Sequence, residues 1–564
     1  MNPDETPAPI AQSTGKVDPP GPLCQPSRWL ALAVLLLAAV VIVTVRIRLL
    51  DIPLERDEGE YAYIGQLVLE GVPPYQLAGN MKMPGIYLAY AAIMSVFGQT
   101  PAGIHLGLLL VNLAILPVLF FVARNFLDLY GAVIATAAYG LMLLSPAYLG
   151  LAAHASNFAV LFALLGLLML LRLKENVAMA ACLGAGSLFG TSFVMNQPGA
   201  AFGIFGGLYL FWVLKKMAWP KILMRLAIFS LGCVAPFLAV CLWLKIAGAF
   251  PQFWFWTFTY AREYATTHTF SAALLNAEYA AQHVLPSTWL LYVFAGVGLA
   301  CLCFTRLPKD KAVFLMGLLV FSVLAVCPGF YFRRHYFVFL APAVALLAGV
   351  AVSASLRQVA QPVRRPLLYH GFFLLGTLLC AQSLYADRAI LFSLSPREAC
   401  RAIYGLNLFP ESLDIARYIK QHSSKDQHTV VVGDEPQIYF YAHRRASISQ
   451  IYPSQTMDPR PYAYQMQERM VSEMEQTPPA FLVYSSLYAS LLPRKDSDPR
   501  LLSWTQNYTR TNMQLVGVIQ FTSPQTTEAA WGPAVETTPR VSPYFILVYQ
   551  ALSISNAAKS ANGQ

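Results

Sequence analysis

Acidic side chains are concentrated in one short segment of the chain, at Glu55, Asp57, Glu58 and Glu60. Only 12% of all residues are charged, so four carboxyl groups within six residues require an explanation. A carboxylate held in place can take a proton from an attacking hydroxyl, and carboxylates can bind a divalent cation. A structural role is the alternative, because Asp57 and Glu60 fit the Asp-x-x-Glu form of a helix capping box.

The same segment is expected to form a short amphipathic helix. Asp57, Glu60 and Tyr61 share one face at helical spacing, an apolar stripe follows them, and Gly71 provides a stop signal. A helix of this kind lies on a membrane surface. Lys82 follows it and places a cation where the chain becomes apolar again. The alternative is that Lys82 only reaches toward lipid headgroups.

A second group of polar side chains lies much further along the chain, at Arg333, Arg334, His335 and Tyr336. Arginine offers forked donors that suit a phosphate, so this segment is a candidate anion site. Anchoring at the membrane interface is the alternative, with Tyr336 among the aromatic residues that favour that depth. His154 lies in another short loop, where polar groups either line a cavity or belong to a helix cap.

The composition places these residues in a membrane protein. Hydrophobic residues make up 56% of the chain and charged residues 12%, against roughly 25% charged residues in soluble proteins. Apolar runs such as 106–122 carry no acid or base and suit a hydrocarbon layer about 30 Å thick. We therefore predict an α-helical polytopic membrane protein with about eleven transmembrane helices and a C-terminal soluble α/β domain. The spans are expected near 29–50, 104–123, 131–148, 156–172, 177–195, 199–214, 226–249, 287–305, 312–327, 335–353 and 367–386.

The basic residues predict the orientation of the chain. The net charge is +10, but the bases form short clusters between apolar runs rather than the stripe that nucleic acid would need. Clusters such as 215–225 mark the cytoplasmic loops. This places the loop 51–103 and everything after about residue 387 outside the cytoplasm, in a multi-pass protein of the cell (inner) membrane. The segment 84–98 is too short to cross and is expected to be re-entrant or interfacial.

Three regions follow from these patterns: a disordered cytoplasmic tail at 1–27, a membrane domain at 28–388 and an extracytoplasmic domain at 389–564. Alternating helical and apolar patterns in the last region predict an α/β layer fold. Cys400 is its only cysteine, so no internal disulfide can hold it, and no Cys/His spacing resembles a zinc site. Its helices are expected near 411–421 and 462–476, and its strands near 429–433, 480–484, 515–521 and 544–549.

On these residues the chain resembles the C-type glycosyltransferase superfamily, and within it bacterial members of glycosyltransferase family 39. These are relatives of protein O-mannosyltransferases and of the aminoarabinose transferase that modifies lipid A. The resemblance covers roughly residues 50–350 and rests on the order of the motifs and their membrane placement. The motifs are Asp57-Glu58 with Tyr61, Ala62 and Ile64; Lys82 and Pro84; Arg334-His-Tyr336 with Pro342; and, in the last domain, the stretch from Gly433 to Tyr441.

The resemblance implies a membrane glycosyltransferase that moves a sugar from a polyprenyl-phosphate donor to an extracytoplasmic glycan, lipid or protein acceptor. It implies that Asp57 and Glu58 are catalytic residues, with Asp57 as the general base, and that direct displacement inverts the sugar carbon. The leaving lipid phosphate then needs fixed cations. Lys82, Arg333 and Arg334 are the candidates for that role. The further substrate-site candidates are Glu60, Tyr61, His154, His335 and Tyr336.

The chain departs from the family at two positions. Relatives often carry an acidic residue in the second outer loop, where this chain has His154, and a basic residue before Gln-Pro, where it has Asn196. These departures leave open a different acceptor, metal independence or lost activity, and a divalent cation held by Glu58 is an open alternative. A transporter or flippase of a lipid-linked precursor and a non-catalytic relative also stay open. Transporters usually have ionisable groups within their spans and repeated halves, whereas these spans are nearly free of charge and no repeat is visible.

Overall fold

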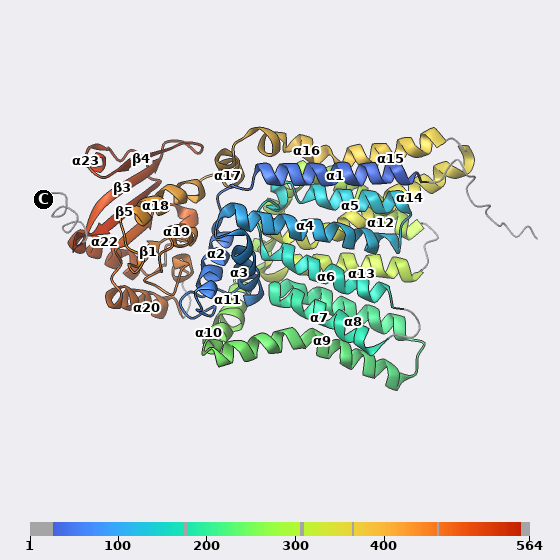
Figure 1. Cartoon of the computed structure of the whole chain (residues 1–564), viewed down its shortest axis with the longest axis horizontal. Coiled ribbons are helices and arrows are strands. Elements are labelled where there is room, and N and C mark those ends of the chain that lie inside the picture. The colour runs from blue at the N-terminus through green and yellow to red at the C-terminus, as the bar shows by residue number, and fades with distance from the viewer. Residues whose placement is uncertain (1–25, 174–177, 305–308, 364–365, 459–461, 554–564) are drawn as a thin grey trace, which may run out of the picture.

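The chain folds into a bundle of long helices with a smaller α/β domain at one end (Figure 1). The computed structural model describes residues 26–173, 178–304, 309–363, 366–458 and 462–553. The predicted tail at 1–27 therefore lies almost entirely outside the described residues.

In the part of the chain that the structure describes, eleven apolar helices make up the bundle, most of them close to the predicted spans, so the prediction of a polytopic helical membrane protein is confirmed. Within the described residues, five segments are long and apolar enough by themselves to cross a membrane: Arg28–Arg48, Pro101–Arg124, Gln197–Leu214, Trp219–Ile246 and Phe270–Leu302. The bundle helices are α1 (Arg28–Arg48), α4 (Pro101–Arg124), α5 (Leu129–Met142), α6 (Ala155–Leu171), α7 (Met179–Met195), α8 (Ala200–Leu214), α9 (Trp219–Ile246), α12 (Phe270–Phe304), α13 (Lys309–Val326), α14 (Ala341–Val363) and α15 (Pro366–Cys380).

Two of the predicted spans have different starts. Helix α12 begins at Phe270 rather than near 287, because its first turns are polar and extend beyond the apolar run from which the span was predicted. The predicted span 335–353 does not form one helix. Its first residues belong to a separate 3₁₀ turn, η6 (Arg334–Phe339), and the regular helix α14 begins at Ala341. This turn leaves the basic residues outside the regular helix.

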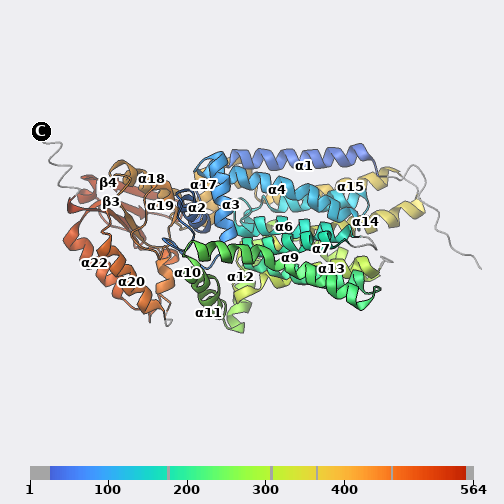
Figure 2. The ribbon, with the colours of Figure 1, turned by 60° about the horizontal axis from the view of Figure 1, so that its bottom comes forward.

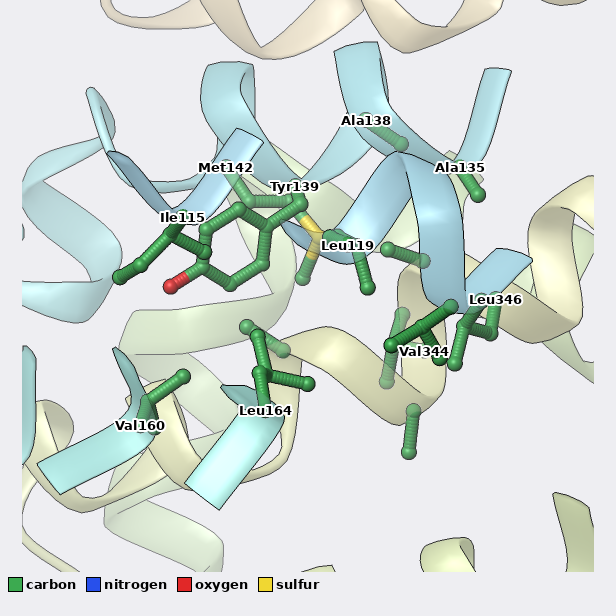
Figure 3. Close-up of a cluster of buried hydrophobic side chains, with 14 of the residues drawn as sticks. Ile115, Leu119, Ala135, Ala138, Tyr139, Met142, Val160, Leu164, Val344 and Leu346 are labelled. Atoms are coloured by element: carbon green, nitrogen blue, oxygen red, sulfur yellow. The ribbon is translucent and has the colours of Figure 1, made fainter. Parts of the chain in front are cut away.

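The bundle core joins residues that lie far apart in the sequence. Tyr139 of α5, Ile115 of α4 and Val344 of α14 belong to one cluster of buried side chains (Figure 3). A Cβ at Gly298 would lie only 1.9 Å from the carbonyl oxygen of Leu347, so α12 and α14 approach backbone to backbone, as small residues permit in membranes. This close packing fixes the helix ends that carry the candidate site.

Short helices form a layer between the bundle and the C-terminal domain (Figures 1 and 2). Helix α2 (Arg56–Leu69) packs there on α3 (Pro84–Phe97). The exposed face expected for an amphipathic surface helix is not observed in α2, because every residue from Glu58 to Leu67 is buried. Helix α19 (Gln437–Ala442) of the C-terminal domain also packs against α2. The layer further includes α10 (Phe250–Trp254), the π-helix η4 (Phe255–Tyr260) and α11 (Ala261–Ala265).

The C-terminal domain contains a mixed five-stranded sheet in the order β1-β2-β5-β3-β4, which confirms the predicted α/β fold. Strands β1 and β2 are parallel, and the other neighbours are antiparallel. The sequence does not predict β4, because its residues are partly exposed and show no apolar alternation. The strands are β1 (Thr429–Val432), β2 (Phe481–Ser485), β3 (Met513–Phe521), β4 (Thr527–Trp531) and β5 (Phe545–Ala551). The main helices are α17 (Pro396–Tyr404), α18 (Phe409–Gln421), α20 (Ala463–Gln476) and α22 (Arg500–Asn512).

Candidate functional site

Helix α2 begins with a capping box formed by Glu55 and Glu58. The Glu58 N–H donates to Glu55 Oε1 at 2.9 Å, and the Glu55 N–H donates to Glu58 Oε2 at 3.3 Å. The alternative in which Asp57 and Glu60 form the capping box is therefore wrong. Because the helix is capped without it, the Asp57 carboxylate stands in the first turn and is available for other contacts.

Three side chains from separate parts of the chain converge on Oδ2 of Asp57. Lys82 Nζ lies 3.3 Å from this oxygen, His154 Nδ1 lies 3.8 Å away, and His335 Nε2 lies 4.0 Å away. Lys82 precedes α3, His154 is the N-cap residue of α6, and His335 lies in η6. The ends of the bundle helices thus assemble one polar cluster from four of the predicted site residues.

The charges around Asp57 keep its carboxyl group ionised. Burial raises the pKa of Asp57, but the positive charges of Lys82 and Arg333 bring it below its ordinary value, and His335 and His154 lower it further when they are protonated. Burial lowers the pKa of Lys82, and the neighbouring acidic groups more than reverse this effect. Asp57 and Lys82 therefore form an ion pair at neutral pH, and the Asp57 side chain keeps 19% of its surface exposed.

His154 and His335 lie face to face, with ring centroids 4.1 Å apart and 14° between their planes. Burial lowers the pKa of both rings, so both are neutral at pH 7. Neither ring nitrogen of His154 has a hydrogen-bond partner in the part of the chain that the structure describes. Such buried, unsatisfied groups are uncommon and require an explanation, and a polar ligand beside Asp57 would provide one.

Asp57, His154 and His335 also fit a divalent cation by the chemistry of their donors. The three donor atoms lie within 4.8 Å of one another, and one carboxylate with two neutral imidazoles is a donor set that transition metals accept. The ammonium of Lys82, 3.3 Å from the same carboxylate oxygen, already places a positive charge there.

Glu58 has a positioning role rather than a free carboxylate. It accepts hydrogen bonds from the Ala153 N–H at 2.6 Å and lies 3.0 Å from His105 Nε2. Its side chain is only 1% exposed. Burial raises the pKa of Glu58, and His105 and these hydrogen bonds lower it further than burial raises it. Glu58 therefore fastens the first turn of α2 to α4 and to the loop that carries His154.

The two adjacent arginines have different surroundings. Tyr264 interacts with Arg333 and raises the pKa of its guanidinium, and Arg333 is one of the charges that lower the pKa of Asp57. Arg334 instead donates to the carbonyl oxygens of Pro146 and of the next residue. The placement therefore favours Arg333 as a phosphate ligand and gives Arg334 a structural contact with the loop before α6.

Glu60, Tyr61 and Tyr336 surround the Asp57 cluster. Glu60 accepts a hydrogen bond from Tyr87 Oη at 2.5 Å, and burial raises the pKa of Glu60 to about 7. The Tyr61 ring centroid lies 5.8 Å from Lys82 Nζ, within the range of a cation–π contact. Burial raises the pKa of Tyr336 to about 12, so Tyr336 stays a neutral hydrogen-bonding group.

The C-terminal domain holds the first turn of α2, which the sequence does not reveal. Arg56 lies 3.3 Å from the Glu435 carboxylate and donates to the Asp434 carbonyl oxygen at 2.6 Å. A Cβ at Gly59 would lie 2.6 Å from Cβ of Gln437, so α2 and α19 touch backbone to backbone. The available signals were a glycine inside the acidic segment and the family-like Gly-Asp-Glu-Pro stretch that precedes α19.

We expect Gly59→Leu to separate the C-terminal domain from α2, because the larger side chain has no space against Gln437. Limited proteolysis of the protein in lipid should then release the domain about tenfold faster than in wild type. Gly296→Leu is the matched control, since open space surrounds Gly296. Equal cleavage of wild type and both variants would show that the contact between α2 and α19 does not hold the domain.

An apolar cavity of about 250 Å³ lies between α12, α13 and η6. Ala281, Val323 and Phe332 are among its lining residues. One of its lining residues, Phe332, directly precedes Arg333 in the chain. The sequence gives no sign of this cavity, because its walls come from apolar residues that look like ordinary lipid-facing or core positions.

No protein-family model and no characterised protein sequence matches this chain. Its three-dimensional structure nevertheless has similar solved structures. ArnT from Cupriavidus metallidurans bound to undecaprenyl phosphate superposes with a TM-score of 0.56 at 15% identity, over 93% of this chain and 98% of that chain. The Archaeoglobus fulgidus oligosaccharyltransferase in the apo form gives 0.52 at 13% identity, over 90% and 75%. The chain has the fold of these two proteins.

The likeness covers both the helical bundle and the C-terminal domain, because it extends over at least 90% of the chain. ArnT in the apo state gives a TM-score of 0.53 at 15% identity over 93% of this chain and 99% of that chain. The expected membrane fold with a soluble domain is thereby confirmed. At such identities the likeness concerns the fold, and the chemistry must be argued from the residues.

Proposed function

We propose that the protein is a membrane glycosyltransferase that moves a sugar from a polyprenyl-phosphate donor to an acceptor at the outer membrane face. The observation that carries the proposal is the ionised Asp57, paired with Lys82 at 3.3 Å and close to Arg333, at the end of a transmembrane bundle. One site therefore offers a proton acceptor and cations for a phosphate. The undecaprenyl phosphate bound to the similarly folded ArnT supports a lipid-phosphate donor.

In the proposed reaction, Asp57 accepts the proton of an acceptor hydroxyl as its oxygen attacks the anomeric carbon. The bond between that carbon and the phosphate oxygen breaks, and the electron pair leaves with the polyprenyl phosphate. Lys82 and Arg333 balance the charge that grows on this leaving group. The ordinary pKa of an aspartate is near 3.9, so Asp57 is a weak base and works through its position.

A divalent cation at this site would be held by Asp57, His154 and His335 and would supply positive charge to the leaving phosphate. Lys82 and Arg333 supply that charge from the chain itself. The neutral His154 and His335 remain as hydrogen-bonding groups for the sugar or the acceptor.

Direct displacement predicts inversion at the sugar carbon. We expect NMR of the product to show the anomeric configuration opposite to that of the donor. Retention of configuration would contradict the single-displacement reaction with Asp57 as the base, since retention requires a second displacement or a covalent intermediate.

We further propose that the apolar cavity between α12 and α13 accepts the first part of the polyprenyl chain. Ala281→Phe should fill this space of about 250 Å³ and raise the KM for a long-chain donor by about tenfold. The KM for a short-chain donor that does not reach the cavity should change little.

Leu275→Phe is the matched control for Ala281→Phe, because Leu275 lies on the same helix and is 67% exposed. If the KM changed equally for long and short donors, or if both substitutions had the same effect on the KM, the cavity would not be the binding site for the polyprenyl chain.

We place the site end of the bundle outside the cytoplasm of the cell (inner) membrane. The clusters at 215–225 and at Arg124 lie at the opposite ends of α4, α8 and α9 from the layer that contains α2 (Figure 1), and basic clusters favour the cytoplasmic side. In this orientation the C-terminal domain is extracytoplasmic, where it meets acceptors that are glycans, lipids or proteins.

A further inference from the structure

A second cavity lies apart from the Asp57 cluster, between the membrane domain and the C-terminal domain. Its volume is about 440 Å³, within the roughly 300–1,000 Å³ range of small-molecule sites. The first outer loop contributes Tyr75 and Gly79, the segment after α9 contributes 251–256, and the C-terminal domain contributes residues from 449 to 469. None of the predicted site residues lines this cavity.

The lining combines aromatic rings with neutral amides. Phe255 of the membrane domain and Tyr462 of the C-terminal domain pack edge to face, with ring centroids 5.4 Å apart and an angle of 87° between the ring planes. Trp256 adds a third ring, and the amides come from Gln252, Gln450 and Gln465. The charged lining residue, Arg469, already pairs with Glu473 at 2.8 Å. Within the described residues, Gln252 Oε1 is buried and has no hydrogen-bond partner.

This chemistry suits a carbohydrate. Sugars offer C–H faces that pack on aromatic rings and hydroxyl groups that pair with amides, and they carry no charge that would need a fixed counterion. A phosphate or an acidic ligand would need free cations. A purely apolar ligand would leave the amides unpaired, at the cost of burying them.

Two features of the backbone, a close approach at Gly79 and the π-helix η4, position the aromatic rings of this cavity. A Cβ at Gly79 would lie 2.3 Å from Trp256 Nε1, so the first outer loop can approach the indole this closely only with a glycine at position 79. Phe255 and Trp256 lie in the π-helix η4, and single-turn π-helices are frequent at functional sites. The rings are therefore held in place from two sides.

Hydrogen bonds connect the cavity to the Asp57 cluster. Tyr75 Oη donates to the backbone carbonyl oxygen of Lys82 at 2.7 Å. From the other wall, Gln450 donates to Gln455 Oε1 at 2.6 Å, and Gln455 donates to Asn80 Oδ1 at 2.9 Å. The loop that carries Lys82 is thus a wall of the cavity.

Asn80 continues this connection into α2, because its Nδ2 donates to Glu60 Oε2 at 2.7 Å. The cavity and the first turns of α2 are therefore parts of one hydrogen-bonded unit. A ligand in the cavity would lie next to the loop that orients Lys82 toward Asp57.

We infer that this cavity binds a neutral carbohydrate portion of the acceptor and holds it between the two domains. The inference rests on the proposed function, since it assigns the acceptor side of that reaction. It also gives the C-terminal domain a role in acceptor binding, because Tyr462 and Gln465 complete a site that the membrane domain alone leaves open.

Saturation-transfer NMR on the full-length protein in lipid nanodiscs tests the inference. The probes are chitotriose, maltotriose, mannotriose and cellotriose, with an uncharged octapeptide as a probe of another class. At least one trisaccharide should receive saturation from the wild type. Replacing Tyr462 and Gln465 together by alanine should lower that signal about tenfold.

Tyr464→Ala is the matched control, because Tyr464 lies on the same helix, is 44% exposed and does not line the cavity. It should leave the signal unchanged. Release of polyprenyl phosphate from donor alone, through attack by water, should be the same in all variants, because none of them touches the Asp57 cluster.

No saturation of any trisaccharide by wild type overturns the inference, as does an equal signal from the double variant. Saturation of the octapeptide alone, lost in the double variant, also overturns it and assigns the cavity to peptides. A failure of the proposed function looks different, because it removes donor turnover in wild type and does not alter the binding of the probes.

Discussion

Asp57→Asn is expected to lower the rate of polyprenyl-phosphate release by about a thousandfold, within the range for loss of a general base. The amide keeps the size of the side chain, but it cannot take the proton of the acceptor hydroxyl. Since Glu55 and Glu58 cap α2 without Asp57, the helix should stay folded. The rate is measured from free polyprenyl phosphate with the purified protein in lipid.

Asp51→Asn is the matched control, because Asp51 is an exposed carboxylate that precedes α2 and takes no part in the capping box. It should retain wild-type release. A thermal unfolding midpoint close to that of wild type would confirm that Asp57→Asn is folded. If folded Asp57→Asn released more than about a tenth of the wild-type amount per unit time, proton transfer to Asp57 could not be the source of the rate.

Lys82→Met is expected to lower the release rate about a hundredfold or more, because the leaving phosphate loses a fixed positive charge. A second effect follows from the pair with Asp57. Lys82 is the strongest of the charges that lower the pKa of Asp57 against the effect of burial, so its removal raises that pKa. Asp57 must be ionised to act, and the acid limb of the pH–rate profile should therefore move to higher pH.

Lys245→Met is the control for Lys82→Met, because Lys245 is an exposed lysine in the last turn of α9. It should change neither the rate nor the acid limb. Lys82→Arg should recover part of the rate, since it restores the charge with a different shape. A slow Lys82→Met variant with an unshifted acid limb would mean that Lys82 does not act on Asp57.

The membrane architecture could be predicted because it depends on local composition. Each bundle helix is itself an apolar run, so its position follows from the sequence with little knowledge of its neighbours. The buried strands β1 and β2 are short β-branched or apolar runs with turns around them, and they were predicted for the same reason. Strand β4 has partly exposed residues and could be recognised only beside β3.

The surroundings of α2 could not be predicted, because they depend on residues nearly 400 positions away. The pattern of α2 indicates one apolar face, and the docking of Gln437 against Gly59 buries the other. The capping box shows the same limit. Both Glu55/Glu58 and Asp57/Glu60 have the required spacing, and only the observed start of the helix distinguishes them.

The members of the site were easier to predict than their individual contacts. Charge and motif order predict Asp57, Lys82 and His335 as site residues, and the structure brings them together. The sequence does not distinguish the roles of Arg333 and Arg334, and the structure shows that Arg334 donates to backbone carbonyl oxygens. The sequence around His154 favours a helix cap at Ser156 or Asn157, and only the distance of 3.8 Å between His154 Nδ1 and Asp57 places His154 in the site.

The most direct test of the proposed function follows two signals from the purified full-length protein in sealed vesicles. One is free polyprenyl phosphate released from a panel of polyprenyl-phosphate sugars, and the other is movement of the same lipids between leaflets. We predict release from at least one donor, abolished by Asp57→Asn, with no change in the rate of movement. Movement of a lipid-linked sugar without release from any donor would contradict the transferase and identify a flippase.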